Sequence, residues 1–397
     1  MPMATESRHS SPGSAQNGLN PRGQGRRSTL HTLLAGAGWC LGATTGGAAS
    51  SVTPAVAQQL KVLTAWEQGE TAYAGVWTPG VAPRGIALPA RAHELLPIPT
   101  SAQLPGAQAL VLARRPGEYL MRMDLTSSRA LHWHDMEEDR YLAGHACASA
   151  DRARFFTTET DGETGAGLIV ERDWRSLEKV REFASHGIGP HALCTLASGD
   201  LLVANGGILN LPESGRRKLN LGRMAPNLCV LDAASGAVRK LHTLDDPYLS
   251  LRHLAVAPDG TVAIAMQAEH ANMQDRAHAP ALALLRDGVL RTVAWDNGQA
   301  PPNWDGYAGD VCCAQGRFWI SAPRAGWLAS WSLRGDALRV VPLRGVGALA
   351  AMGAQLIAGG ETDALLVAPD STTSTHYHLP AAWDNHAAVI GSLSPRT

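Results

Sequence analysis

The repeated segment that decides the fold is HALCTLASGDLLVAN at residues 191–205, with copies at 253–266 (HLAVAPDGTVAIAM) and 145–159 (HACASADRARFFTTE). Each copy opens with His, continues as a short apolar run, turns at Asp, Ser or Gly, and ends in a second apolar run. Short apolar runs bounded by turn residues are typical of buried strands. Each copy therefore predicts two strands joined by a turn.

Weaker copies extend the repeat in both directions. DVCCAQGRFWIS (310–321) and GALAAMGAQLIA (347–358) lack the opening His, and His93 begins a degenerate copy whose second strand is Leu110–Ala113. The starts lie about 40–60 residues apart, a period typical of propeller blades. No long helical pattern interrupts them, so the sequence predicts an all-β architecture.

The number of blades follows from the ends of the chain. A seventh start, NHAAVIG at 385–391, has no downstream strands to pair with, but Lys61–Trp66, Tyr73–Trp77 and Gly85–Leu88 have strand character. Pairing the two ends closes the ring and leaves no open sheet edge. We therefore predict a single seven-bladed β-propeller over residues 58–397, closed by strands from both termini.

The N-terminal residues have the features of an export signal. Residues 1–24 are rich in Ser, Gly, Pro and Asn, which predicts a disordered leader. GRRSTL at 25–30 is followed by an uncharged, moderately apolar region that ends in the cleavage pattern AVA at 55–57. Residues 1–57 are thus expected to be a leader plus a twin-arginine signal peptide, which implies a periplasmic protein. Thr29 stands where the usual pattern has Phe, so a Sec signal or a basic tail remains an alternative.

Composition excludes several classes of protein. The 397 residues carry 34 Lys and Arg against 35 Asp and Glu, so no global field attracts nucleic acid or anionic lipid. The apolar region after the arginine pair is broken by glycines, so no stable membrane span is expected. Five of the six cysteines follow residue 57, without a CxxC pattern, and we expect free thiols. A strained bond between Cys312 and Cys313 is the alternative.

The histidines that open the repeats are the first candidate site. His145, His191 and His253 begin inner strands, so they would surround one end of the central channel, with His93 and His386 in equivalent places. His186 precedes His191 in the glycine-rich segment SHGIGPH. Neutral imidazoles suit Fe, Cu or Zn, so a transition-metal site is one interpretation. In the other, each His caps the hydrogen bonds between blades.

Two further polar clusters are candidates. Arg216, Arg217 and Lys218 concentrate positive charge in the connection after Asn205, and these four residues could hold a carboxylate or phosphate at the channel mouth. Their alternative partners are the carboxylates Glu159, Asp161 and Glu163. HWHD at 132–135 places two histidines on one strand face, as in a metal site, or forms an exposed polar loop.

Several segments resemble the family called domain of unknown function 1513. The resemblance extends over roughly residues 60–391 and implies an exported, propeller-like protein. It also implies a gene neighbourhood with imelysin-like and di-haem peroxidase-like proteins, which would be its partners in periplasmic iron acquisition. The segments are FFTTE (155–159), SHGIGPH (185–191), VANGGI (203–208), GRRKLN (215–220), RHLAVAPDG (252–260) and WDNH (383–386).

Two functions from different classes follow. The chain contains no G-x-S-x-G, P-loop, H-E-x-x-H, haem-attachment or dinucleotide-binding pattern. The favoured hypothesis is therefore a binding or accessory protein for a metal, a small anion or a protein partner. The alternative is a metal-dependent redox enzyme that uses the histidine-lined channel mouth, since propeller enzymes assemble their sites from several blades.

Overall fold

The computed structural model describes residues 60–214, 217–367 and 374–391. The leader, the signal peptide and the domain boundary expected after residue 57 lie outside these ranges. The described residues form seven four-stranded antiparallel sheets, which confirms the predicted all-β, seven-bladed propeller. None of the helices within these ranges has the length and hydrophobicity needed to cross a membrane.

Each blade is named here by its innermost strand, and its strands follow one another outward. The first three complete blades are β4 (Ala92–Ile98), β5 (Gln108–Ala113), β6 (Tyr119–Asp124) and β7 (Arg129–Asp135); β8 (Arg140–Ala148), β9 (Arg154–Asp161), β10 (Ala166–Asp173) and β11 (Lys179–Ile188); and β12 (Pro190–Thr195), β13 (Leu201–Asn205), β14 (Asn227–Leu231) and β15 (Val238–His242).

The remaining blades follow the same order. They are β16 (Leu249–Val256), β17 (Val262–Ala268), β18 (Leu282–Arg286) and β19 (Val289–Thr292); β20 (Val311–Ala314), β21 (Arg317–Ala322), β22 (Trp327–Ser332) and β23 (Arg339–Pro342); β24 (Ala348–Met352), β25 (Gln355–Gly359), β26 (Asp363–Val367) and β27 (Ser374–His378); and the shared blade β28 (Trp383–Val389), β1 (Val62–Gln68), β2 (Thr71–Thr78) and β3 (Val81–Leu88).

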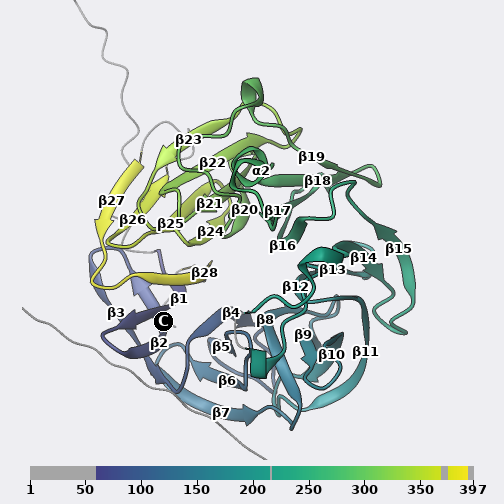
Figure 1. Ribbon diagram of the computed structural model, residues 1–397. Coiled ribbons are helices and arrows are strands. Elements are labelled where there is room, and N and C mark those ends of the chain that lie inside the picture. Colours follow the sequence, from purple (N-terminus) through teal and green to yellow (C-terminus); the bar gives the residue numbers. More distant parts are fainter. Residues whose placement is uncertain (1–59, 215–216, 368–373, 392–397) are drawn as a thin grey trace, which may run out of the picture. The chain divides into compact units, whose positions relative to one another are not determined.

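The blades are arranged around a central channel. Figure 1 shows β28, β4, β8, β12, β16, β20 and β24 innermost, and each of these strands contacts the next, with β24 returning to β28. All seven inner strands begin at the same end of the channel, because every blade repeats the same antiparallel strand order. Residues at the start of the repeats are therefore brought together although they lie far apart in the sequence.

The shared blade closes the ring. β28 pairs antiparallel with β1, with Val389 opposite Val62 and Ala388 opposite Leu63. The C-terminal strand is thus innermost, and the three strands near the N-terminus lie outside it, as the sequence predicted. Closure gives β1 a partner on its inner side and completes the seventh four-stranded sheet.

The core lies between adjacent sheets rather than in the channel. Alternate residues of the inner strands face neighbouring blades, and the large side chains of Trp77, Trp319 and Trp331 are fully buried there. Burial of each such apolar side chain stabilises the fold by about 1.5–3 kcal/mol. The helical pieces within the described ranges are short: α2 (Met273–His278), η1 (Pro212–Ser214), η2 (Leu221–Arg223) and η3 (Asp296–Gly298).

Candidate metal centre

Five histidines gather at the end of the channel where the inner strands begin. They are His93 on β4, His145 on β8, His191 on β12, His253 on β16 and His386 on β28. Their exposed fractions lie between 4% and 9%, so all five rings are buried. The prediction that the repeated His would surround one end of the channel is confirmed, and His93 and His386 belong to the ring as expected.

A β-bulge accompanies every one of these histidines. The pairing of the inner strand with its neighbour shifts register between Ala92 and Glu94, Leu142 and Ala146, Pro190 and Leu193, Leu251 and Leu254, and Trp383 and Ala387. β20 and β24, which carry no His, pair without a shift. Since a bulge re-aims side chains and bends its strand, it turns each His into the channel.

Nitrogens of neighbouring imidazoles lie within hydrogen-bonding distance of one another. His93 Nε2 is 3.1 Å from His145 Nε2, and His191 Nε2 is 3.0 Å from His253 Nε2. One nitrogen from each of His93, His145, His253 and His386 lies within 4.8 Å of those of the other three. His191 packs against His145 and His253 of this group.

Two carboxylates orient rings of this group. Glu94 Oε2 lies 3.0 Å from His145 Nδ1 and also accepts the backbone N–H of Ala146. Asp310 Oδ1 lies 3.2 Å from His386 Nδ1. A carboxylate on Nδ1 holds the proton there and leaves Nε2 as a lone-pair donor, which is the arrangement found behind metal-ligating histidines.

Burial keeps most of the rings neutral. It lowers the pKa of His93, His191 and His253 well below the usual value, and neighbouring imidazoles lower it further. The pKa of His145 is also lowered by burial, although the hydrogen bond that its ring donates to Glu94 opposes the shift. Burial lowers the pKa of His386 too, but Asp310 and other carboxylates outweigh it, so the net shift is upward.

The donor set fits a transition metal. Bonds of about 2.0–2.1 Å place adjacent ligand nitrogens about 2.9–3.4 Å apart, which matches the 3.1 Å between His93 Nε2 and His145 Nε2. Opposite ligands are at most about 4.2 Å apart, so binding of all four would draw the rings slightly inward. His386 Nε2 is buried and has no hydrogen-bond partner within the described chain, and a metal ion would satisfy it.

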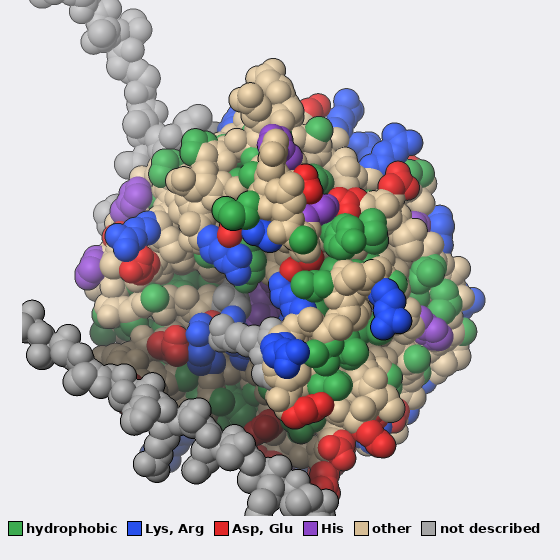
Figure 2. Space-filling view, in the orientation of Figure 1, with side chains coloured by type: hydrophobic (Ala, Val, Ile, Leu, Met, Phe, Trp, Pro, Cys, Tyr) green, Lys and Arg blue, Asp and Glu red, His purple; other side chains and the backbone are tan. Residues whose placement is uncertain are grey.

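A cavity of about 390 Å³ continues from the histidines along the channel. Residues of all seven inner strands line it, and His145, His253 and His386 form part of its wall. Figure 2 shows His side chains at the base of the central hollow, with Lys and Arg side chains around it. The candidate centre therefore has room beside it for a small molecule.

Two of the sequence-predicted site residues lie outside this cluster. His186 is exposed on β11, the outermost strand of its sheet, and its Nε2 lies 3.2 Å from the Gly236 carbonyl. Asn205 is fully buried, and its amide donates to the Ser185 carbonyl and to Asn227 Oδ1. These bonds join neighbouring segments, and a ligand role for either residue stays a prediction.

The basic segment after Asn205 has mixed surroundings. Arg216 lies outside the described residues, and Arg217 is exposed. Lys218 pairs with Glu269, a carboxylate that the sequence did not suggest as its partner. Two of the suggested partners pair elsewhere, Glu159 with Arg172 and Asp161 with Arg140.

The HWHD segment forms structural contacts. His132 Nε2 lies 3.0 Å from the Ser176 carbonyl, and His134 Nε2 lies 3.2 Å from a guanidinium nitrogen of Arg172. Arg172 is fully buried and pairs with Glu159, so this network joins the outer strands of two adjacent blades. Within the described chain all five cysteines are free, as expected.

Sequence reasoning missed the two orienting carboxylates, although signals for both were present. Glu94 directly follows the His of its repeat. Asp310 occupies the first position of its copy, where the other copies have His. Its Oδ2 also accepts a hydrogen bond from the backbone N–H of Leu349. A polar residue that replaces the repeated His indicates that this position faces the same site.

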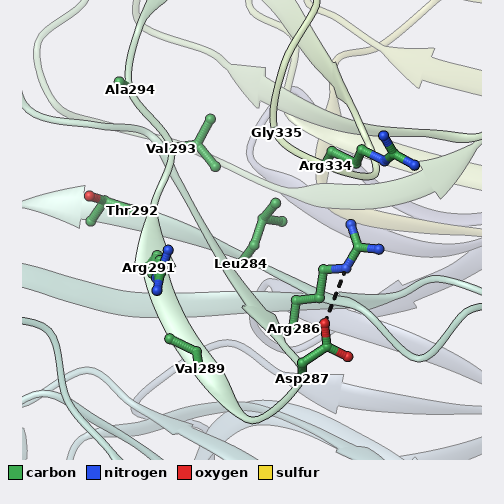
Figure 3. A pocket seen from close by; sticks show the side chains of 10 residues that line it. All are labelled: Leu284, Arg286, Asp287, Val289, Arg291, Thr292, Val293, Ala294, Arg334 and Gly335. Atoms are coloured by element: carbon green, nitrogen blue, oxygen red, sulfur yellow. Dashed lines mark ion pairs between the residues drawn. The ribbon is translucent and has the colours of Figure 1, made fainter.

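A second hollow, of about 440 Å³, lies at the rim of the β16 and β20 blades. Figure 3 shows Arg286, Arg291 and Arg334 around it, with Arg286 paired to Asp287 at 3.7 Å. All three arginines are exposed, and none comes from an inner strand. Water can solvate these cations, so the hollow does not require a charged ligand.

The sequence matches a family model over residues 86–390, described as protein of unknown function (DUF1513). The chain belongs to this family. The expected resemblance is thus confirmed, and the family description assigns no activity. No curated protein matches the chain at a significant level.

Solved structures share the fold at low identity. Hydrazine synthase from Kuenenia stuttgartiensis matches with a TM-score of 0.53 and 13% identity, covering 85% of this chain and 99% of that one. Selenomethionine-substituted virginiamycin B lyase from Staphylococcus aureus matches with a TM-score of 0.50 and 10% identity, covering 72% and 84%. The WD40 repeats of RRP9 match with a TM-score of 0.50 and 11% identity, covering 75% of this chain and 85% of that one. At these identities the likeness concerns the fold alone.

Proposed function

We propose that this propeller binds one first-row transition-metal ion at the channel end through His93, His145, His253 and His386. The observation that carries the proposal is the convergence of four buried imidazole nitrogens within 4.8 Å. The carboxylates Glu94 and Asp310 behind two of the rings support it, because they direct Nε2 toward the group.

The alternative, in which each His only joins neighbouring blades by hydrogen bonds, explains fewer of these observations. If each His were needed to join neighbouring blades, the β20 and β24 blades would need one too, yet they form regular sheets without it. Histidine pairs such as His93 and His145 can share a hydrogen bond, but this leaves the Nε2 of His386 buried without a partner. An unsatisfied buried polar group costs about 1–3 kcal/mol, a cost that a bound metal removes.

Imidazole ligands favour Fe, Cu or Zn over Mg or Ca, which prefer oxygen. Metal-free protein should therefore be prepared with a chelator and titrated separately with Fe(II), Cu(II) and Zn(II) under anaerobic conditions. We expect about one equivalent of at least one metal to bind tightly. His93→Ala and His253→Ala should abolish stoichiometric binding, whereas the exposed control His186→Ala should retain it.

Metal contents below about 0.2 equivalents for all three ions in the wild-type protein would contradict the proposal. Equal loss of binding in the His186→Ala control would contradict it as well, because that residue lies on the outermost strand. Circular dichroism of each variant separates loss of the site from loss of the fold.

The proposed place of action is the periplasm, in iron or metal acquisition. The arginine pair at 26–27, the AVA pattern at 55–57 and the family resemblance support export by the twin-arginine route. The proposed partners are the imelysin-like and di-haem peroxidase-like proteins. Replacement of Arg26 and Arg27 by Lys should retain a tagged protein in the cytoplasm, whereas export independent of the pair would indicate the Sec route.

A metal-dependent redox enzyme is the second candidate. The cavity of about 390 Å³ beside His145, His253 and His386 favours it, because a substrate there would lie next to the metal. Reduction and reoxidation of the bound metal, followed spectroscopically, should occur through many cycles if this function is correct. A bound ion that cannot be cycled would leave the binding function alone.

A further inference from the structure

We infer a second binding site at the mouth of the channel, in which Arg115 and Arg252 hold the carboxylate or phosphate group of a small anion. Arg252 directly precedes His253 on β16, and Arg115 lies in the connection between β5 and β6. These residues differ from the basic segment that the sequence suggested. The site does not require a metal at the histidines.

Arg252 is the first observation. Its side chain is 3% exposed, and its Nε is buried without a hydrogen-bond partner. A Cβ added to Gly206 would lie 3.4 Å from Arg252 Nη1, an ordinary van der Waals contact, so the guanidinium packs beside the chain just after β13. Buried guanidinium groups are otherwise paired with carboxylates in protein interiors, because an uncompensated buried charge is costly.

Arg115 is the second observation. Within the described chain, no hydrogen bond or ion pair joins Arg115 or Arg252 to another residue. Burial lowers the pKa of Arg115 to about 9, and the positive charges of Arg252 and Arg114 contribute to this shift. The guanidinium groups therefore lie close enough to repel one another, an arrangement that an anion between them would stabilise.

The carboxylates nearby do not neutralise this charge. Glu269 raises the pKa of both arginines, but its Oε2 is already paired with Lys218. The charge of Arg252 also lowers the pKa of His191 and His253, which places its guanidinium near the ring. Figure 2 shows Lys and Arg side chains, with some Asp and Glu side chains, around the central hollow. An anion bound by Arg252 would lie beside the candidate metal centre, because Arg252 directly precedes His253.

Calorimetric titration of chelator-treated, metal-free protein tests this site at low ionic strength. The probes are inorganic phosphate and citrate, which represent the two anion sources, with chloride as the reference salt. We expect saturable binding of at least one probe. Arg115→Gln and Arg252→Gln should each weaken it about tenfold or more, because each removes charged hydrogen bonds. The exposed control Arg291→Gln, at the outer hollow, should bind like the wild type.

Thermal unfolding separates this role from a structural one. Removal of a half-buried cation that has no partner should leave the melting temperature of Arg115→Gln unchanged or raised, while the stabilisation by the anion is lost. Absence of saturable binding by both probes overturns the proposal. A melting temperature that falls in Arg115→Gln with anion binding intact, or equal weakening in Arg291→Gln, overturns it too. The metal titrations remain an independent result.

Discussion

At the scale of the residue, the ability of the candidate centre to bind a metal depends on which group contacts the second nitrogen of each imidazole. His145 and His386 have carboxylates on Nδ1, whereas His191 packs against His253. A repeated His could therefore be found from the sequence, but its protonation state and direction depend on a residue in another blade. Glu94 and His145, for example, belong to adjacent inner strands.

Glu94→Gln tests the orienting role of this carboxylate. The amide cannot hold the Nδ1 proton of His145 as a carboxylate does, so metal affinity should fall about 10–100-fold. Metal titration measures the effect, and Glu118→Gln, an exposed control, should leave the affinity unchanged. An unchanged affinity in Glu94→Gln, with the fold intact, would show that His145 needs no orienting partner.

The buried rings also predict how stability depends on pH in the metal-free protein. The folded-state pKa values of His93, His145, His191 and His253 are lowered, so below about pH 6.5 the unfolded chain binds protons that the folded chain does not. The free energy of unfolding should therefore fall as pH drops from about 7.5 to 5.5, by about 1.4 kcal/mol per pH unit for each net proton.

His386 acts in the opposite direction. Its raised pKa contributes stability that is present below the unfolded value and is lost as pH rises through the folded one. The four histidines with lowered pKa values outweigh His386, so the free energy of unfolding should still fall as pH drops. Urea unfolding with a chelator present measures it, and His253→Leu should flatten the slope relative to His186→Leu. A flat or inverted wild-type profile would contradict the pKa directions.

At the scale of the element, the bulge is the feature that converts a strand residue into a channel residue. β4, β8, β12, β16 and β28 shift register at their His, and β20 and β24 do not. The strands themselves follow from short apolar runs and turns. The bulges could not be predicted, because they depend on how each strand pairs with its neighbour rather than on hydrophobic periodicity.

Gly144→Ala tests this geometry. Gly144 lies within the β8 bulge at φ +107°, and an added Cβ would lie 2.4 Å from Cδ2 of His93. The His93 ring must therefore move, which should weaken metal binding in addition to lowering stability. The matched control is Gly260→Ala, at φ +82° with nothing within 4 Å, which should lose only the backbone preference, about 1–2 kcal/mol.

Urea unfolding and metal titration on both variants distinguish the two effects. If Gly144→Ala and Gly260→Ala lose similar stability and both keep full metal affinity, the position of His93 does not depend on the bulge. Loss of affinity in Gly144→Ala alone supports the arrangement described.

At the scale of the whole molecule, both ends of the described chain complete one blade. β28 supplies the inner strand and also His386, so closure of the ring and completion of the histidine cluster depend on the same strand. Inner strands contact one another around the full circle, and each blade buries its faces against its neighbours. The cluster therefore forms only when the last blade closes.

A truncation at residue 382 tests this dependence. Without residues 383–397 the edge of β1 is unpaired and His386 is absent, so we expect loss of cooperative unfolding or association through the open edge. Size-exclusion chromatography and urea unfolding measure these outcomes, with a chain ending at Gly391 as the control. Addition of a peptide spanning 383–391 should restore the monomer. A stable, metal-binding monomer without β28 would refute the coupling.

The sequence by itself determined the all-β class, seven blades, closure by both termini and the recurrence of His at one blade position. These follow from local apolar periodicity, turn residues and the repeat, which are properties of neighbouring residues. Only the tertiary structure decided which histidines converge, that Glu94 and Asp310 orient them, and that the guanidinium of Arg252 is buried with an unpaired Nε. The physical reason is that these groups come from different blades, and bulges and ring closure set the distances between them.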